Sequence, residues 1–162
     1  MQAPRQLEHR QGLYTEAERR RRDSSPWTTV QAILAPLQFL VFLVSLGLVL
    51  RTLLTGEGVY AANASIIIKT LLLYTIMVTG SLWEKHVFGK YLFAPAFFWE
   101  DAVSFIVIAL HTAYLIGLLT GTMSETGLLW LALVAYATYV VNAAQFLLKL
   151  RSARLSAAEA VS

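Results

Sequence analysis

The sequence has 162 residues, which suits a single domain, but its composition sets it apart from water-soluble domains. Hydrophobic residues make up 57% of the chain and charged residues only 14%, with a net charge of +3. A soluble domain carries about 25% charged residues, so the balance argues against a soluble enzyme, a disordered chain and a nucleic-acid-binding module. The chain has no cysteine, which excludes a disulfide framework, a thiolate zinc site and a cysteine nucleophile.

A polar segment opens the chain, and four apolar runs follow it. The runs are Thr28–Leu50, Tyr60–Trp83, Ala102–Met123 and Thr126–Leu148. Each run is long enough to cross a bilayer, because about 20 helical residues span a hydrocarbon core of roughly 30 Å. In lipid the backbone must satisfy its own hydrogen bonds, so each run is expected to be a helix. We therefore predict an all-α bundle of four transmembrane helices, with residues 1–26 as a polar N-terminal tail, 27–150 as the membrane domain and 151–162 as a C-terminal tail.

The cationic side chains fall almost entirely on one side of this topology. Eleven lie before the first run, between the second and third runs or after the fourth run, where Lys149 is the first of them, and only Arg51 lies on the opposite side. Cytoplasmic segments are enriched in Lys and Arg, so we predict that both termini are cytoplasmic. Trp27, Trp83 and Trp99 stand at the ends of runs, as residues of an interfacial aromatic belt do.

The densest polar cluster flanks the loop between the second and third runs. Glu84 and His86 follow the second run, and Glu100 and Asp101 open the third. Antiparallel neighbours would bring three carboxyl groups and an imidazole to one membrane level. An apolar boundary favours the neutral form of a carboxyl group, which can then act as an acid. Solvated charge at helix ends is the alternative, since acidic residues in a first turn complement the helix dipole. The spacing is not diagnostic of a metal site, so none is predicted.

Two ionisable residues interrupt the runs themselves, at similar predicted depth. Lys69 lies in the second run and His111 in the third. Ionisable groups at this depth are costly and usually face the bundle interior or a cavity. The functional interpretations are a substrate contact, a proton relay or a ligand for a pigment's metal; the structural one is a snorkelling lysine and a packed, neutral imidazole. Interhelical hydrogen bonds are expected from Gln31, Gln38, Asn142 and Gln145.

Several longer strings resemble one known family. They are SPWT at 25–28, APLQF at 35–39, GSLWEK at 80–85, FGKYLFAPAFFWED at 88–101, ALHTAY at 109–114 and NAAQFL at 142–147. Together they resemble the 2-vinyl bacteriochlorophyllide hydratase family of phototrophic bacteria, over about residues 13–155. The long unbroken string at 90–101 is more specific than any short motif in the chain.

The resemblance implies a reaction of bacteriochlorophyll a synthesis, in which water adds to the C3 vinyl group of chlorophyllide a, or of its bacteriochlorin form, to give a 1-hydroxyethyl group. It implies a hydro-lyase of the bacterial inner membrane. The implied partners are a chlorophyllide-type tetrapyrrole, lipid and neighbouring pigment-synthesis enzymes, and no nucleic acid. No cofactor is expected, because the central magnesium belongs to the substrate.

Vinyl hydration needs a neutral acid, a base that places water, and a flat apolar slot. We predict Glu100 or Glu84 as the acid, with Asp101 or His86 orienting the water. His111 and Glu100 stand three helical turns apart, so one small reacting group cannot touch both.

Other residues are predicted to bind the macrocycle. His111 is the candidate ligand of the substrate's magnesium, Lys69 is a candidate substrate contact, and Lys90 is a candidate partner of the propionate. Candidate stacking residues are Trp83, Trp99, Phe97 and Phe98. Two interpretations compete with the enzyme: a pigment carrier without turnover, and a small transporter subunit that relays protons through Lys69 and His111.

Overall fold

The computed structural model describes residues 12–161, within which there are five helices and no strands. Helix α1 (Glu16–Ser24) precedes four long helices, α2 (Pro26–Thr55), α3 (Val59–Phe88), α4 (Phe98–Thr120) and α5 (Glu125–Glu159). All four are long and apolar enough to cross a membrane, which confirms the predicted fold class. Arg5 and Arg10 of the predicted tail lie outside the described residues.

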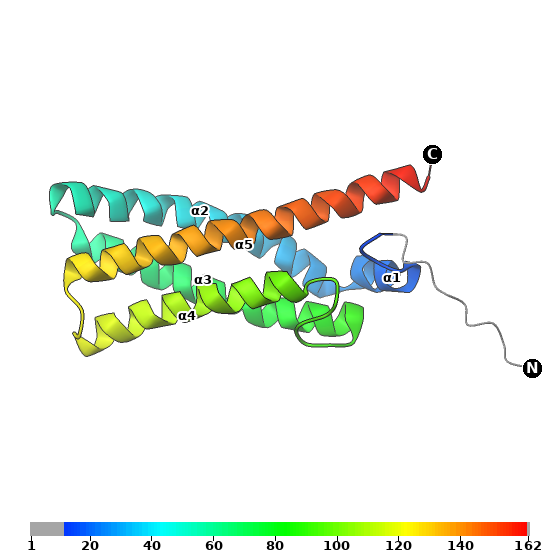
Figure 1. Ribbon diagram of the computed structural model, residues 1–162, viewed down its shortest axis with the longest axis horizontal. Helices are drawn as coiled ribbons and strands as arrows, with labels where there is room; N and C mark the ends of the chain where they lie inside the picture. Colours follow the sequence, from blue (N-terminus) through cyan, green and yellow to red (C-terminus); the bar gives the residue numbers. More distant parts are fainter. Residues whose placement is uncertain (1–11, 162) are drawn as a thin grey trace, which may run out of the picture.

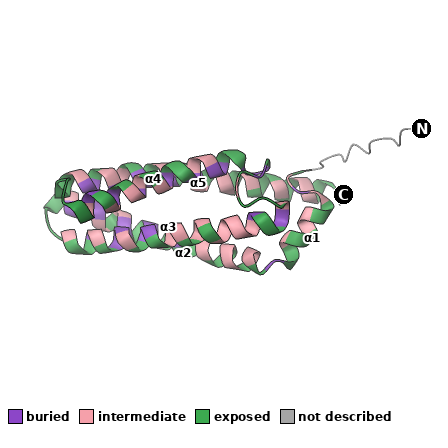
Figure 2. Ribbon diagram, turned by 90° about the horizontal axis from the view of Figure 1, so that it is seen from below, coloured by how far each residue is buried: buried purple, intermediate pink, exposed green. Residues whose placement is uncertain are grey.

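The long helices form an antiparallel bundle of two layers, α2 with α3 and α4 with α5 (Figures 1 and 2). Helix α1, the α3–α4 loop and the carboxyl end of α5 lie together at one end of the bundle, on the right in Figure 1. We call this the α1 end. The helices of 30 residues extend about 45 Å, so they exceed the roughly 30 Å hydrocarbon core.

Local caps set the helix ends. Ser25 Oγ accepts a hydrogen bond from the N–H of Trp27 at 3.3 Å, and Pro26 occupies the first turn of α2. Gly89 ends α3 with a φ of 82°, a left-handed conformation that glycine adopts at little cost. Gly121, with a φ of 63°, follows α4, so this helix stops before the predicted end at Met123.

Helix α1 lies within the predicted polar tail and was not expected from hydropathy. A capping box starts it: the hydroxyl of Thr15 accepts from the N–H of Glu18, whose carboxylate accepts from the N–H of Thr15. Arg21 Nε donates to the carbonyl of Val87 at 2.9 Å, which satisfies one of the free carbonyls at the end of α3. Helix α1 is thereby attached to the α1 end of the bundle.

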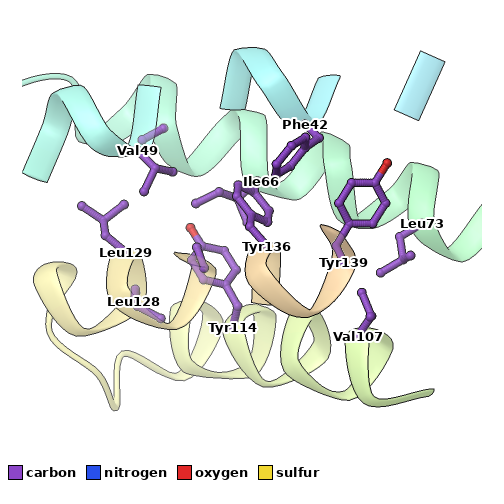
Figure 3. Close-up of a cluster of buried hydrophobic side chains, with 12 residues drawn as sticks. Phe42, Val49, Ile66, Leu73, Val107, Tyr114, Leu128, Leu129, Tyr136 and Tyr139 are labelled. Atoms are coloured by element: carbon purple, nitrogen blue, oxygen red, sulfur yellow. The ribbon is translucent and has the colours of Figure 1, made fainter. Parts of the chain in front are cut away.

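Two apolar cores fill the bundle. The larger one brings Phe42 and Val49 of α2 against residues of the other three long helices (Figure 3). Within it the Tyr136 hydroxyl and Ser45 Oγ are 2.5 Å apart. The smaller core lies at the α1 end and is mainly aromatic; its members include Tyr14, Trp83, Phe88, Phe97 and Phe146.

Candidate active site

The structure brings the three predicted carboxyl groups together at the α1 end. Glu84 comes from the last turns of α3, and Glu100 and Asp101 come from the first turn of α4. Their exposed fractions are only 4%, 5% and 6%, so these are not solvated helix-end charges. A buried charge is costly unless it is paired, so the partners of each carboxyl group decide what it can do.

The three groups have different partners. Glu100 Oε2 lies 2.8 Å from Lys149 Nζ, which makes a partly buried ion pair. Asp101 Oδ2 accepts the backbone N–H of Phe93 at 2.8 Å. Neither oxygen of Glu84 accepts a hydrogen bond from any donor in residues 12–161.

Glu84 and Asp101 face each other. Their carboxyl groups lie within hydrogen-bonding reach, and no cation forms an ion pair with either of them among the described residues. Two buried carboxyl groups this close together favour the state in which they share one proton. The arrangement therefore supplies one neutral carboxylic acid and one carboxylate side by side, which are the two groups that proton transfer to and from a substrate needs.

The loop before α4 carries a strained residue that positions this pair. Phe93 has a φ of 58°, a conformation that costs about 1–2 kcal/mol for a residue with a side chain. Its N–H bond to Asp101 and its ring stacked on Phe105, with centroids 5.5 Å apart, hold it there. A backbone donor on the carboxylate favours the ionised form of Asp101 over that of Glu84.

The first turn of α4 is fixed from α5. Asn142 Nδ2 donates to the backbone carbonyl of Glu100 at 2.9 Å, and its Oδ1 accepts from Ser104 at 3.0 Å. This confirms the expectation that Asn142 bonds across helices. Gln31 also does so, since its amide donates to Thr79 of α3 at 2.6 Å.

An aromatic layer lies at the same end of the bundle as the acidic cluster. The rings of Trp83 and Phe97 meet edge to face with centroids 5.6 Å apart, and Trp83 Nε1 donates to the hydroxyl of Thr28 at 2.9 Å. Tyr14 stacks on Phe88 with centroids 5.8 Å apart. These flat apolar side chains pack on one another at the end of the bundle that holds the carboxyl groups; the slot for a macrocycle stays a prediction.

Some predicted site residues are not part of this cluster. His86 and Lys90 are exposed, and Trp99 is 70% exposed. His86 stands two residues after Glu84, so on a helix the two side chains point in different directions. Trp99 also points away from the cluster, whereas Trp83 is half-buried in the aromatic core beside it.

Lys69 and His111 form a second, deeper polar region. Both are fully buried, and they lie near enough to interact electrostatically. Lys69 Nζ lies 3.4 Å from the ring centroid of Tyr139, and His111 Nδ1 lies 2.8 Å from the carbonyl of Val107. Asp101 precedes His111 by ten residues, about 15 Å along the helix, so the structure separates this region from the carboxyl groups.

No metal site is evident among the described residues, since no group of three His, Asp or Glu side chains is arranged to hold an ion. A cavity of about 130 Å³, lined by residues that include Thr52, Gly56 and Glu125, lies at the opposite end of the bundle. It is too small for a macrocycle, because pockets for drug-sized ligands measure about 300–1,000 Å³.

Sequence reasoning missed the role of one site residue. Lys149 was interpreted only as a cytoplasmic charge, yet it forms the ion pair with Glu100. No signal in a single sequence identifies it, because which turn of α5 lies beside α4 follows from packing.

Comparison with known proteins gives one consistent result. A family model described as 2-vinyl bacteriochlorophyllide hydratase matches residues 14–152. A protein of that name from Rhodobacter capsulatus is 70% identical over 149 residues, which are 92% of this chain and 86% of the relative. Another from Cereibacter sphaeroides is 71% identical over 144 residues, 88% of this chain and 89% of the relative. No solved structure matches the chain significantly.

Proposed function

The chain belongs to the 2-vinyl bacteriochlorophyllide hydratase family and is therefore a hydro-lyase, and we propose that it hydrates the C3 vinyl group of chlorophyllide a or of 3-vinyl bacteriochlorophyllide. The product is the 3-(1-hydroxyethyl) pigment of bacteriochlorophyll a biosynthesis. The names of the two relatives support the tetrapyrrole substrate. The site supports the reaction type, and the observation that carries it is the buried Glu84–Asp101 pair.

The reaction needs one proton transfer in each direction. The terminal vinyl carbon takes a proton from a neutral acid, and the resulting cation lies at the inner carbon, where the macrocycle shares its charge. Water then forms a C–O bond at that carbon and gives up one proton. The net change is the addition of one water, with the acid regenerated.

Glu84 is the acid in this proposal and Asp101 is the base. Glu84 has no hydrogen-bond donor in the described chain and no cation, so the shared proton belongs on it. Asp101 accepts the N–H of Phe93, which favours its carboxylate form, and that form can hold and deprotonate the attacking water. Burial excludes bulk water and strengthens both interactions.

The macrocycle lies against the aromatic layer in this proposal, with Trp83 and Phe97 nearest the reacting vinyl group. Lys90, exposed at the same end, is placed to pair with the propionate carboxylate, and Trp99 to contact the macrocycle or lipid. His111 Nε2 has no partner in the described chain, but His111 is 1% exposed. It therefore reaches the substrate's magnesium only if the ring enters between the helices.

The protein's surroundings follow from the same proposal. Four spanning helices and the pathway of the relatives fit the bacterial inner membrane, with the α1 end toward the cytoplasm as the positive charges predict. The partners are then lipid and the enzymes that supply and consume the pigment.

Isotope transfer tests the reaction. Membranes that hold the protein are incubated with chlorophyllide a in oxygen-18 water, and separately in D₂O, and the product is analysed by mass and absorbance. We expect one labelled oxygen in the first medium and one deuterium in the new methyl group in the second. Pigment binding without product would instead favour the carrier.

Substitutions test the residue roles. Glu84→Gln and Asp101→Asn should each lower kcat by roughly 10²–10⁴-fold, the contribution of a general acid or base. His86→Gln is the matched control, because His86 lies on the same helix but is exposed. The assignment is wrong if both carboxyl variants keep the wild-type rate in protein shown to be folded.

A further inference from the structure

The acidic cluster contains three carboxyl groups and one ion-paired cation, and their arrangement suggests how the site keeps a single proton. We propose that Lys149 is a positioning residue: it neutralises Glu100 and so restricts the site proton to the Glu84–Asp101 pair. This inference rests on the proposed function and adds to it a residue of α5 that touches neither the pair nor, by its placement, the substrate.

The contacts of Lys149 tie three parts of the site together. Its Nζ lies 2.8 Å from Glu100 Oε2, donates to the carbonyl of Ala96 at 2.5 Å, and stands 5.5 Å from the centroid of the Phe97 ring. Its side chain is 27% exposed and that of Glu100 only 7%, so the ion pair is largely removed from water. A charge in such a position is screened less than one at the surface.

The backbone of Glu100 is fixed beside the pair, whether or not its charge is paired. Asn142 donates to its backbone carbonyl at 2.9 Å, the Ser104 hydroxyl, shared between this carbonyl and Asn142 Oδ1, lies 2.8 Å from it, and Glu100 is the chain neighbour of Asp101. Without Lys149, a buried carboxylate would lack a counter-ion beside a second carboxylate. It would then take a proton itself, which places a second proton beside the pair and disturbs the base.

Two other cations at this end of α3, Arg21 and Lys85, do not replace Lys149, since Lys85 donates to the carbonyl of Gly89 at 3.0 Å. Arg21 uses its Nε on the carbonyl of Val87 rather than on a carboxylate. Among the ion pairs of residues 12–161, the one between Lys149 and Glu100 alone involves a site carboxyl group. The charge of Lys149 is therefore the one to remove in a test.

Kinetics of five variants test the inference. Lys149→Met should lower kcat by roughly 100-fold, which corresponds to one uncompensated charge near the pair, and Lys149→Arg should restore most of the rate. In the Glu100→Gln background, Lys149→Met should have less than a threefold further effect. The double variant should thus exceed Lys149→Met by at least tenfold. Arg151→Met removes an exposed cation from the same helix and should not change the rate.

Two kinetic results would overturn the inference. If Glu100→Gln is as inactive as Glu84→Gln, then Glu100 is itself a catalytic group and Lys149 serves it directly. If the double variant is as slow as Lys149→Met, then Lys149 acts through its bond to Ala96 rather than through charge.

An infrared measurement separates this inference from the proposed function, because it needs no turnover. Protonated carboxyl groups give a C=O stretching band that carboxylates lack. The substrate-free wild type should show one site band that Glu84→Gln removes, and Lys149→Met should add a second band that Glu100→Gln removes. An unchanged spectrum in Lys149→Met refutes the role of Lys149 even if hydration is confirmed. If the bands appear as expected but no turnover is detected, the proposed function is refuted and the role of Lys149 is not.

Discussion

Lys69 offers a quantitative test of how the bundle holds a charge in its interior. The side chain is completely buried in α3, and its Nζ has no hydrogen-bond partner in the described residues. The Nζ lies over the Tyr139 ring, 3.4 Å from its centroid (Figure 3 shows this ring in the core). The stability of the protein therefore depends on whether the ring compensates for the buried charge.

The contact with the Tyr139 ring is expected to offset only part of the free-energy cost of burying the Lys69 charge. A lysine at the centre of a spanning helix costs about 2.5–3.5 kcal/mol on the insertion scale. A desolvated cation–π contact contributes about 2 kcal/mol. The difference is about 1 kcal/mol, so Lys69→Met, which keeps the length of the side chain, should raise the free energy of unfolding by about that amount.

Unfolding by SDS in mixed micelles, followed by circular dichroism, measures this change. A double-mutant cycle with Tyr139→Leu isolates the contact and should give a coupling of about 2 kcal/mol, since the lost packing of the ring on its other neighbours cancels. A loss of 1 kcal/mol or more in Lys69→Met would refute the reasoning and indicate an anionic partner. If Lys69→Met is at least as stable as the wild type but loses hydratase activity, then Lys69 contacts the substrate, as predicted from the sequence.

Two further predictions concern the α1 end. Asn142→Leu removes two interhelical hydrogen bonds, one to Ser104 and one to the carbonyl of Glu100. At about 0.6 kcal/mol for each bond, the free energy of unfolding should fall by about 1 kcal/mol. No change in the same SDS titration would contradict the contact. A cysteine pair at Gly12 and Ser156 should cross-link on mild oxidation, because a Cβ on Gly12 would lie 3.6 Å from that of Ser156 and the chain has no other cysteine. The φ of 98° at Gly12 strains any side chain there, so the yield should be lower than for an unstrained pair. Failure to form the cross-link, judged by gel mobility before and after reduction, would place the segment before α1 elsewhere.

The fold was predictable because hydropathy in a membrane protein leaves few alternatives. Apolar runs of sufficient length must be helices, and their number and short connections define the bundle. Hydropathy did not predict helix ends, since caps such as Ser25 and Gly89 extend helices into polar sequence. It also did not predict α1, a polar helix recognisable from the Thr15 and Glu18 capping box alone.

The site was predictable in part for a similar reason. Antiparallel neighbours place the end of α3 beside the start of α4, so the meeting of Glu84 with Asp101 follows from topology. The direction of each side chain around its helix does not, and His86 is exposed for that reason. Lys149 lies 49 residues from Glu100, and only the packing of α5 brings them together.

The separation of the two polar regions bears on where hydration takes place. Water is one of the reactants, and it is abundant at the headgroup level but scarce at the bilayer centre. The Glu84–Asp101 pair lies near a helix end, whereas Lys69 lies well inside α3 and is fully enclosed. A macrocycle with a carboxylate at one edge and an apolar body also prefers this level of the membrane, with its charge toward water. The reactants, the neutral acid and the carboxylate thus meet most readily at the α1 end, which favours the carboxyl pair over the deeper lysine and histidine as the place of reaction.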